Sequence, residues 1–164
     1  LSKLTSNQYE LTLEDVNLGE LAKERTVLYK KIFSDDAQKQ EFIFDIADDF
    51  IVNCDKYYIG QTVDNLISNA VNYGNNKPVT ISIRRVEDNG VSFSIKDQGI
   101  GIPQTELLSI FAKFSTSSRT STLAGGRGVG LALCKSVIEA HAGEIGATSD
   151  DKETKFTFTL PHKP

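Results

Sequence analysis

The sequence of 164 residues has few of the side chains that most often bind metals or form cross-links. It contains two cysteines, Cys54 and Cys134, and two histidines, His141 and His162. Neither pair has metal-ligand spacing, which argues against a histidine-based metal site and favours buried thiols in a reducing compartment. No apolar run approaches the roughly 20 residues of a membrane-spanning helix, and no signal peptide is recognisable. A net charge of −4 argues against a broad nucleic-acid-binding surface.

The overall composition is typical of one soluble globular domain, because 39% of the residues are hydrophobic and 24% are charged. The spacing of Asn17 and Glu20 resembles a capping box and predicts a helix from there to about residue 34, with an apolar stripe of Leu18, Leu21, Ala22, Leu28, Ile32 and Phe33. Asp55 is expected to cap a second helix that ends near Tyr73. Further helices are predicted at 104–110 and 131–141.

Alternating apolar residues predict strands at 9–13, 41–46, 50–52, 79–83, 91–95, 145–148 and 155–160. Two hairpins are expected, one joining 41–46 to 50–52 and the other joining 79–83 to 91–95. Strands that come in hairpins argue against a doubly wound parallel sheet. The sequence therefore predicts an α+β two-layer sandwich, with helices on one face of a mixed, mostly antiparallel sheet.

A glycine-rich stretch, Gly125-Gly126-Arg127-Gly128-Val129-Gly130-Leu131, leads directly into the last predicted helix. Glycines at alternate positions let a ligand touch the backbone, and a helix start offers free N–H groups and the positive end of a dipole. This pattern favours phosphate binding, although a flexible loop that caps the helix would have the same composition. The spacing is neither GxGxxG nor that of a P-loop, because no Lys-Ser/Thr follows.

Asparagines gather on one face of the predicted helix 55–73, because Asn65, Asn69, Asn72 and Tyr73 lie at helical spacing. An amide oxygen is a neutral, hard ligand that suits Mg²⁺ held by nucleotide phosphates, whereas the alternative is a solvated face. A second glycine turn, Asp97-Gln98-Gly99-Ile100-Gly101-Ile102-Pro103, follows the second hairpin. The residues 113–125 are rich in Ser, Thr and Gly, which is typical of a lid or a disordered loop.

Four motifs in this order resemble those of sensor histidine kinases. Residues 64–73 resemble their N box, 97–103 their first glycine box, 110–114 their F box and 126–131 their second glycine box. The resemblance implies a Bergerat-type ATP-binding fold with about three helices, a flexible ATP lid, and ATP and Mg²⁺ as cofactors. It also implies two segments. Residues 1–14 would be the end of a dimerisation and phosphoacceptor helix followed by a linker strand, and residues 15–164 would be the catalytic ATP-binding domain.

The resemblance also implies roles for individual residues. Asn69 would be the metal ligand and, with Asn65, a catalytic residue, while Asp97 would accept a hydrogen bond from the adenine amino group. Tyr73 would pack against adenine, and Phe111 and Phe114 would anchor the lid, unless they serve only the core. The full set expected to contact the nucleotide is Asn65, Asn69, Asn72, Tyr73, Asp97, Gly99, Gly101, Ile102, Phe114, Arg119, Gly126, Arg127, Gly128, Val129, Gly130 and Leu131.

The chain departs from the family pattern at charged positions. Asn72 stands where the family often has a lysine, and Thr116 stands where an arginine is frequent. Arg119 and Arg127 are the nearby arginines that could supply these charges. If one of them contacts the terminal phosphate, replacing both by alanine should weaken ATP binding much more than ADP binding.

The resemblance implies a protein-histidine kinase of a two-component system, located in the cytoplasm, whose γ-phosphate acceptor is a histidine outside this sequence. Neither histidine here lies in the family's acceptor motif; His141 is expected to cap or pack at a helix end, and His162 lies in a terminal tail. The expected partners are the protein's own dimerisation domain and a response regulator receiver domain, but no nucleic acid. The longer protein would be a homodimer, and this stretch alone a monomer with little autophosphorylation.

Two alternatives remain. The first is an ATPase of the same fold that activates water. Such enzymes, for example DNA gyrase, carry a glutamate four residues before the metal asparagine, but this chain has Asn65 there, which cannot act as a base for water. The second alternative is a degenerate module that binds a nucleotide or a partner without catalysis. The missing N-box lysine favours it, whereas Asn69 and Asp97 argue against it.

Overall fold

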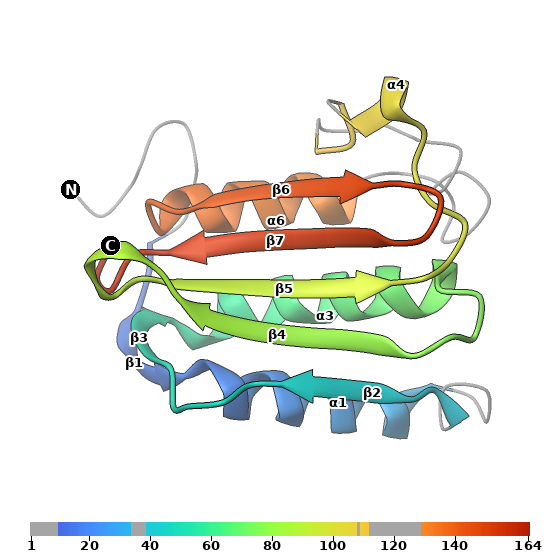
Figure 1. Ribbon diagram of the computed structural model, residues 1–164. Helices are drawn as coiled ribbons and strands as arrows, with labels where there is room; N and C mark the ends of the chain where they lie inside the picture. Colours follow the sequence, from blue (N-terminus) through green and yellow to red (C-terminus); the bar gives the residue numbers. More distant parts are fainter. Residues whose placement is uncertain (1–9, 34–38, 108, 112–128) are drawn as a thin grey trace.

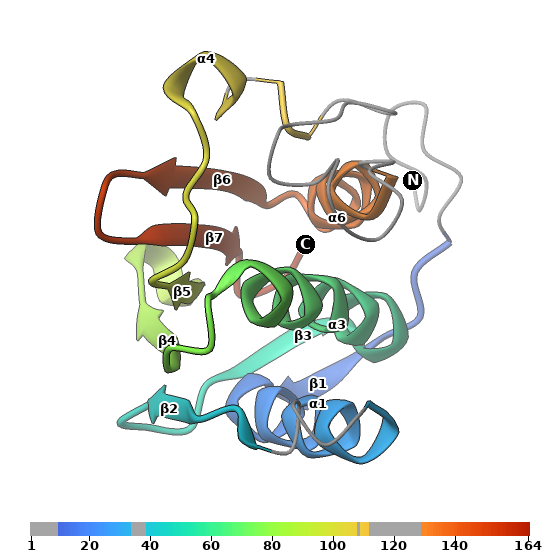
Figure 2. The same ribbon diagram turned by 90° about the vertical axis from the view of Figure 1, so that its right-hand side faces the viewer.

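The computed structural model, which describes residues 10–33, 39–107, 109–111 and 129–164, has one layer of helices and one layer of sheet. Helices α1 (Leu18–Ile32), α3 (Lys56–Tyr73) and α6 (Val129–Ala140) lie on the same face of a five-stranded sheet (Figure 1). Seen from the edge of the sheet, α3 lies between α1 and α6 (Figure 2). The predicted α+β two-layer sandwich is confirmed.

The five-stranded sheet has the order β2-β4-β5-β7-β6. Its strands are β2 (Phe42–Asp45), β4 (Val79–Arg85), β5 (Val91–Asp97), β7 (Thr154–Leu160) and β6 (Glu144–Ser149). β2 and β4 are parallel, and the other neighbours are antiparallel, so the sheet is mixed and mostly antiparallel as predicted. A separate antiparallel pair consists of β1 (Leu13–Asn17) and β3 (Ile51–Asp55). The short helices are a 3₁₀ turn at Glu87–Asn89 and α4 (Gln104–Leu107).

One of the two predicted hairpins is wrong. The hairpin of β4 and β5 forms as predicted, with Ile83 opposite Phe93. The strands expected at 41–46 and 50–52 also form, but they do not pair with each other. β2 pairs with β4 and β3 pairs with β1, because apolar alternation identifies a strand without identifying its partner. The first strand begins at Leu13 rather than at residue 9, since its pairing with β3 runs from Leu13 to Asn17.

The predicted caps of the first two helices are confirmed. The side chain of Asn17 accepts a hydrogen bond from the backbone N–H of Glu20 at 3.1 Å. The carboxylate of Asp55 accepts one from the N–H of Tyr58 at 3.0 Å and another from the N–H of Thr12 at 2.7 Å. Each cap satisfies an N–H group that the first turn of a helix leaves without a partner. Asp55 thereby also fixes the chain just before β1.

The core lies between the sheet and the helices, where alternate residues of β4, β5 and β7 are buried. Phe93 and Phe158 stack across β5 and β7 with their ring centroids 4.8 Å apart. The stripe predicted for α1 is partly wrong, since Leu28, Ile32 and Phe33 are exposed, whereas Thr26 and Tyr29 are buried. Thr26 can be buried because its hydroxyl donates to the carbonyl of Ala22 at 2.8 Å.

Two further helices differ from the prediction at their ends. The helix expected at 104–110 is reduced to α4, and the helix expected from 131 begins at Val129. None of the helices in the described ranges is long and apolar enough to cross a membrane.

Candidate functional site

Helix α3 carries the asparagines of the candidate site. Asn65 and Asn69 are half-buried, and the side-chain oxygen of Asn69 is shielded from solvent. Asn72 is exposed and donates a hydrogen bond to the hydroxyl of Ser68 at 3.3 Å. Tyr73 is 4% exposed. The four positions therefore differ in exposure: Asn72 faces solvent, Asn65 and Asn69 are half-buried, and Tyr73 lies in the interior.

Asn65 connects α3 to the start of α6. Its amide nitrogen donates to the carbonyl oxygen of Gly130 at 3.4 Å, and Gly130 is the second residue of α6. The next residue, Leu131, is 5% exposed and packs in the core, and this fixes the first turn of α6 against the rest of the domain. The structure therefore brings the end of the glycine-rich stretch next to the first asparagine of α3.

The first glycine turn is packed against the last turn of α3. Asp97, the last residue of β5, is 1% exposed and accepts a hydrogen bond from the N–H of Gly99 at 3.0 Å. The N–H of Ile100 donates to the carbonyl of Tyr73 at 3.2 Å. A Cβ atom on Gly99 would lie 1.6 Å from that carbonyl oxygen, so no larger residue fits there. Asp97, Gly99 and Tyr73 therefore form one cluster.

Ser149, which the sequence analysis missed, anchors the other end of this turn. Its hydroxyl accepts from the N–H of Ile102 at 2.9 Å and lies 2.7 Å from the hydroxyl of Thr154, while its carbonyl accepts from Gln104 at 2.6 Å. Gly101 lies between these contacts and has a φ of +76°, which glycine adopts without strain. Thr154 pairs with Asp97 in the sheet, but nothing in the sequence indicates this pairing of distant strands.

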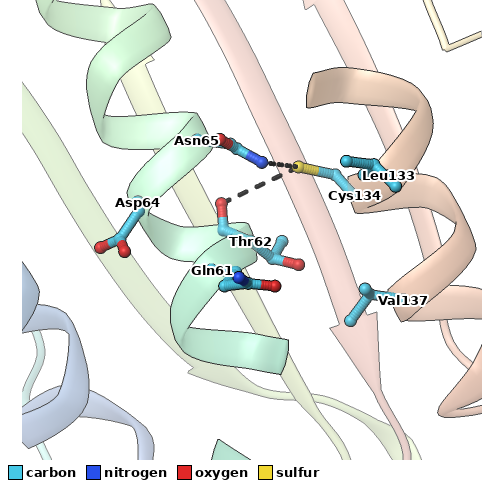
Figure 3. A pocket seen from close by; sticks show the side chains of 7 residues that line it. All are labelled: Gln61, Thr62, Asp64, Asn65, Leu133, Cys134 and Val137. Atoms are coloured by element: carbon cyan, nitrogen blue, oxygen red, sulfur yellow. Dashed lines mark hydrogen bonds between the residues drawn. The ribbon is translucent and has the colours of Figure 1, made fainter. Parts of the chain in front are cut away.

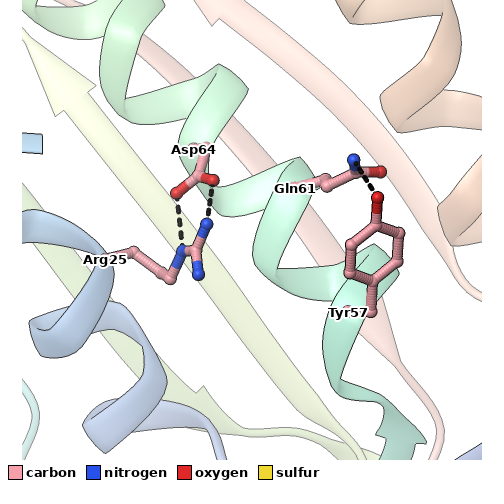
Figure 4. Close-up of polar contacts among 4 residues, drawn as sticks. All are labelled: Arg25, Tyr57, Gln61 and Asp64. Carbon is pink, nitrogen blue, oxygen red and sulfur yellow. Dashed lines mark hydrogen bonds and ion pairs between the residues drawn. The ribbon is translucent and has the colours of Figure 1, made fainter. Parts of the chain in front are cut away.

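An ion pair between Arg25 and Asp64 joins α1 to α3 (Figure 4). The Nε atom of Arg25 lies 2.8 Å from one carboxylate oxygen, and Nη2 contacts the other, so the pair is bidentate. The hydrogen bond to Asp64 raises the pKa of Arg25 above its ordinary value, against the effect of burial. Asp64 directly precedes Asn65, so this pair fixes the turn of α3 that carries the first asparagine.

His141 lies beyond the end of α6 and is completely buried. Its Nε2 atom accepts a hydrogen bond from the backbone N–H of Asp55 at 3.0 Å, and its Nδ1 atom lies 2.8 Å from the carbonyl of Val137. A carbonyl accepts only, so the ring is neutral with its proton on Nδ1. Burial lowers the pKa of His141, although the Val137 carbonyl and the Asp55 carboxylate oppose this shift. The predicted packing role is confirmed.

Five of the predicted contact residues lie outside the described residues: Phe114, Arg119, Gly126, Arg127 and Gly128. The whole of the expected lid, 113–125, also lies outside the described residues, as does the side chain of Val129. Phe111 is described, and its ring packs edge-on against that of Phe156 with centroids 6.0 Å apart. Phe111 therefore packs against the core, and its expected role at the lid stays a prediction.

Residues 54–164 match the family model described as histidine kinase-, DNA gyrase B- and HSP90-like ATPase. The chain belongs to this family. It is 37% identical to the sensor histidine kinase WalK of Bacillus subtilis over 169 residues, covering 99% of this chain and 27% of WalK. The chain therefore spans about a quarter of the length of that relative. The match to the family model and the identity to WalK together show that the chain is homologous to the ATP-binding catalytic domains of sensor histidine kinases.

Solved structures agree with this assignment. The nucleotide-free catalytic domain of histidine kinase ThkA superposes with a TM-score of 0.80 at 27% identity, covering 93% of this chain and 97% of that one. ThkA in complex with the response regulator protein TrrA superposes with a TM-score of 0.78 at 26% identity, covering 97% of this chain and 44% of that one. The fold expected for a histidine kinase catalytic domain is thus confirmed.

Proposed function

We propose that this domain binds ATP with Mg²⁺ and donates the γ-phosphate to a histidine on a dimerisation domain, for transfer to a response regulator aspartate. The observation that carries the proposal is the contact of Asn65 with Gly130, because it brings the asparagine face of α3 to the end of the glycine-rich stretch. The complex of ThkA with TrrA supports a response regulator as the partner.

The side chains at the site fit a nucleotide with a divalent cation. Asn69 and Asn65 offer neutral amide oxygens, and Mg²⁺ is typically held by one or two protein oxygens together with phosphate oxygens and water. Asp97 is an acceptor suited to the amino group of adenine, and it lies beside the last turn of α3, whereas Asn65 is near the middle of that helix. The bound ion would neutralise phosphate charge. Asn65 and Asn69 would hold it, and Asp97 would orient the base.

Phosphoryl transfer depends largely on positioning and on the neutralisation of charge, so the domain needs no nucleophile of its own. Asn65 has no basicity with which to activate water, and we therefore expect slow hydrolysis of bound ATP. Both features favour transfer to a histidine on another domain over an ATPase. Contacts of the base with Tyr73, and of the phosphates with Arg119 or Arg127, stay predictions.

Calorimetric titration with a non-hydrolysable ATP analogue, with and without Mg²⁺, tests the binding. We expect Mg²⁺-dependent binding that Asn69→Ala weakens at least about 10-fold and that Asn53→Ala, a control on β3, leaves unchanged. Binding that ignores Mg²⁺, or none by the folded domain, would favour the degenerate module. Transfer is tested separately by adding [γ-³²P]ATP and the dimerisation domain of a WalK-type kinase, with acid-labile label on its histidine as the expected product.

A further inference from the structure

The amide of Asn65 has a second partner besides Gly130, the thiol of Cys134 on α6 (Figure 3). Its Nδ2 atom lies 3.8 Å from the sulfur, and the sulfur lies 3.9 Å from the carbonyl oxygen of Thr62, one turn earlier on α3. Both distances are within the range of hydrogen bonds that involve sulfur. Cys134 thus lies between two groups of α3, although it belongs to α6.

The hydrogens in this arrangement have one consistent placement. The carbonyl of Thr62 can only accept, so the S–H of Cys134 donates to it and the sulfur lone pairs accept from Asn65. The carbonyl of Gly130 also only accepts, so Nδ2 rather than Oδ1 of Asn65 faces α6. Burial raises the pKa of Cys134 to about 12, which keeps the thiol protonated and able to donate.

We propose that Cys134 is a positioning residue: together with the carbonyl of Gly130 it holds the N–H groups of the Asn65 amide, and so directs the oxygen of Asn65 away from Cys134, toward the ligand. The consequence for nucleotide binding rests on the function proposed above. The orientation of the amide does not, and it can be measured in the protein without nucleotide.

Packing alone does not fix this amide, because a cavity of about 300 Å³ adjoins it between α3 and α6. Gln61, Thr62, Asp64, Leu133 and Val137 complete the wall of this cavity (Figure 3). A Cβ atom on Gly130 would come no closer than 3.7 Å to the Asn65 side chain, which is ordinary van der Waals contact. The polar contacts therefore determine the orientation, and the thiol supplies one of them.

Replacement of Cys134 by valine, alanine and serine separates its polar role from its volume. Valine fills the site without a polar atom, serine keeps a donor and an acceptor, and Cys134→Ala is the second test should valine prevent folding. Cys54, a buried cysteine on β3, provides the matched control Cys54→Val. The side-chain amide signals of Asn65 are identified in ¹⁵N-labelled, nucleotide-free protein by their loss in Asn65→Asp.

We expect Cys134→Val or Cys134→Ala to shift these signals and speed their exchange with water, while Cys134→Ser and Cys54→Val preserve slow exchange. The affinity gained on adding Mg²⁺ should fall about 3- to 10-fold in the first two variants and stay within about 2-fold in the others. Unchanged Asn65 signals in Cys134→Val or Cys134→Ala would overturn the proposal. Wild-type protein that shows the slow exchange but binds no nucleotide would instead refute the proposed function.

Discussion

The buried histidine provides a sharp test of the structure, through the dependence of stability on pH. His141 accepts the N–H of Asp55 only while its Nε2 atom is unprotonated. Burial lowers the pKa of this ring, and the Val137 carbonyl and the Asp55 carboxylate oppose the shift. The unfolded chain, with a histidine pKa near 6.5, binds the proton more readily than the folded protein. The contribution of His141 to stability is therefore complete above about pH 6.5 and is lost as the pH falls through the folded-state pKa.

The magnitude follows from linkage. Between the two pKa values, each pH unit removes up to about 1.4 kcal/mol from the free energy of unfolding. A change from pH 7.5 to 5.5 covers about one pH unit below the histidine pKa of the unfolded chain, so it should cost up to about 1.4 kcal/mol through this one group. Replacing His141 by glutamine removes that dependence, because the glutamine amide does not titrate but still offers an acceptor for the N–H of Asp55 and a donor for the carbonyl of Val137.

Urea unfolding at both pH values measures this effect, with His162→Gln, in the exposed tail, as the control. We expect the free energy of unfolding of wild type and of the control to fall more than that of His141→Gln between pH 7.5 and 5.5, by up to about 1.4 kcal/mol. Parallel losses in all three proteins would refute the reasoning. Should His141→Gln not fold, NMR titration of wild type decides, because a folded-state pKa at or above 6.5 contradicts the buried neutral ring.

Three further outcomes are expected. Gly99→Ala should lower the free energy of unfolding by more than about 3 kcal/mol in urea, because its Cβ would lie 1.6 Å from a backbone carbonyl oxygen, whereas Gly146→Ala, with open space around it, should change it by less than about 0.5 kcal/mol. A double-mutant cycle of Arg25→Met and Asp64→Asn should give a coupling energy of about 1 kcal/mol that decreases in 1 M salt; no coupling would show that the half-exposed pair is not held. Thr62→Val should leave the melting temperature unchanged or raise it, because the Thr62 hydroxyl is buried and has no hydrogen-bond partner in the part of the chain that the structure describes; a loss of several degrees would contradict this.

Local chemistry explains what the sequence predicted well. The caps at Asn17 and Asp55 depend on groups three residues apart, and the hairpin of β4 and β5 depends on a short turn between alternating residues. The placement of the asparagines on α3 and of a turn after Asp97 was likewise predictable, because each depends on residues close together in the chain; their role at a nucleotide stays a prediction.

Features that depend on distant parts of the chain could not be predicted in this way. The parallel pairing of β2 with β4 joins residues that nothing local relates, so a hairpin was the natural but incorrect choice. The anchoring of Ile102 by Ser149, and of Asn65 by Cys134, likewise requires β6 and α6 to be in place. The stripe of α1 was misassigned because Thr26 satisfies its own hydroxyl and can therefore occupy an apolar face.

The neighbouring strands β5 and β7 are far apart in the chain, and this affects how much its length can change. Between Asp97 and Thr154 the chain contains α4, α6, β6 and the glycine-rich stretch. The entropic cost of closing such an interval grows only with the logarithm of its length, by about 0.6 kcal/mol per doubling. Insertions or deletions there would leave the pairing of the two strands nearly as favourable as before. Evolution can therefore change the length of the segments between these two strands while the pairing of β5 with β7 stays the same.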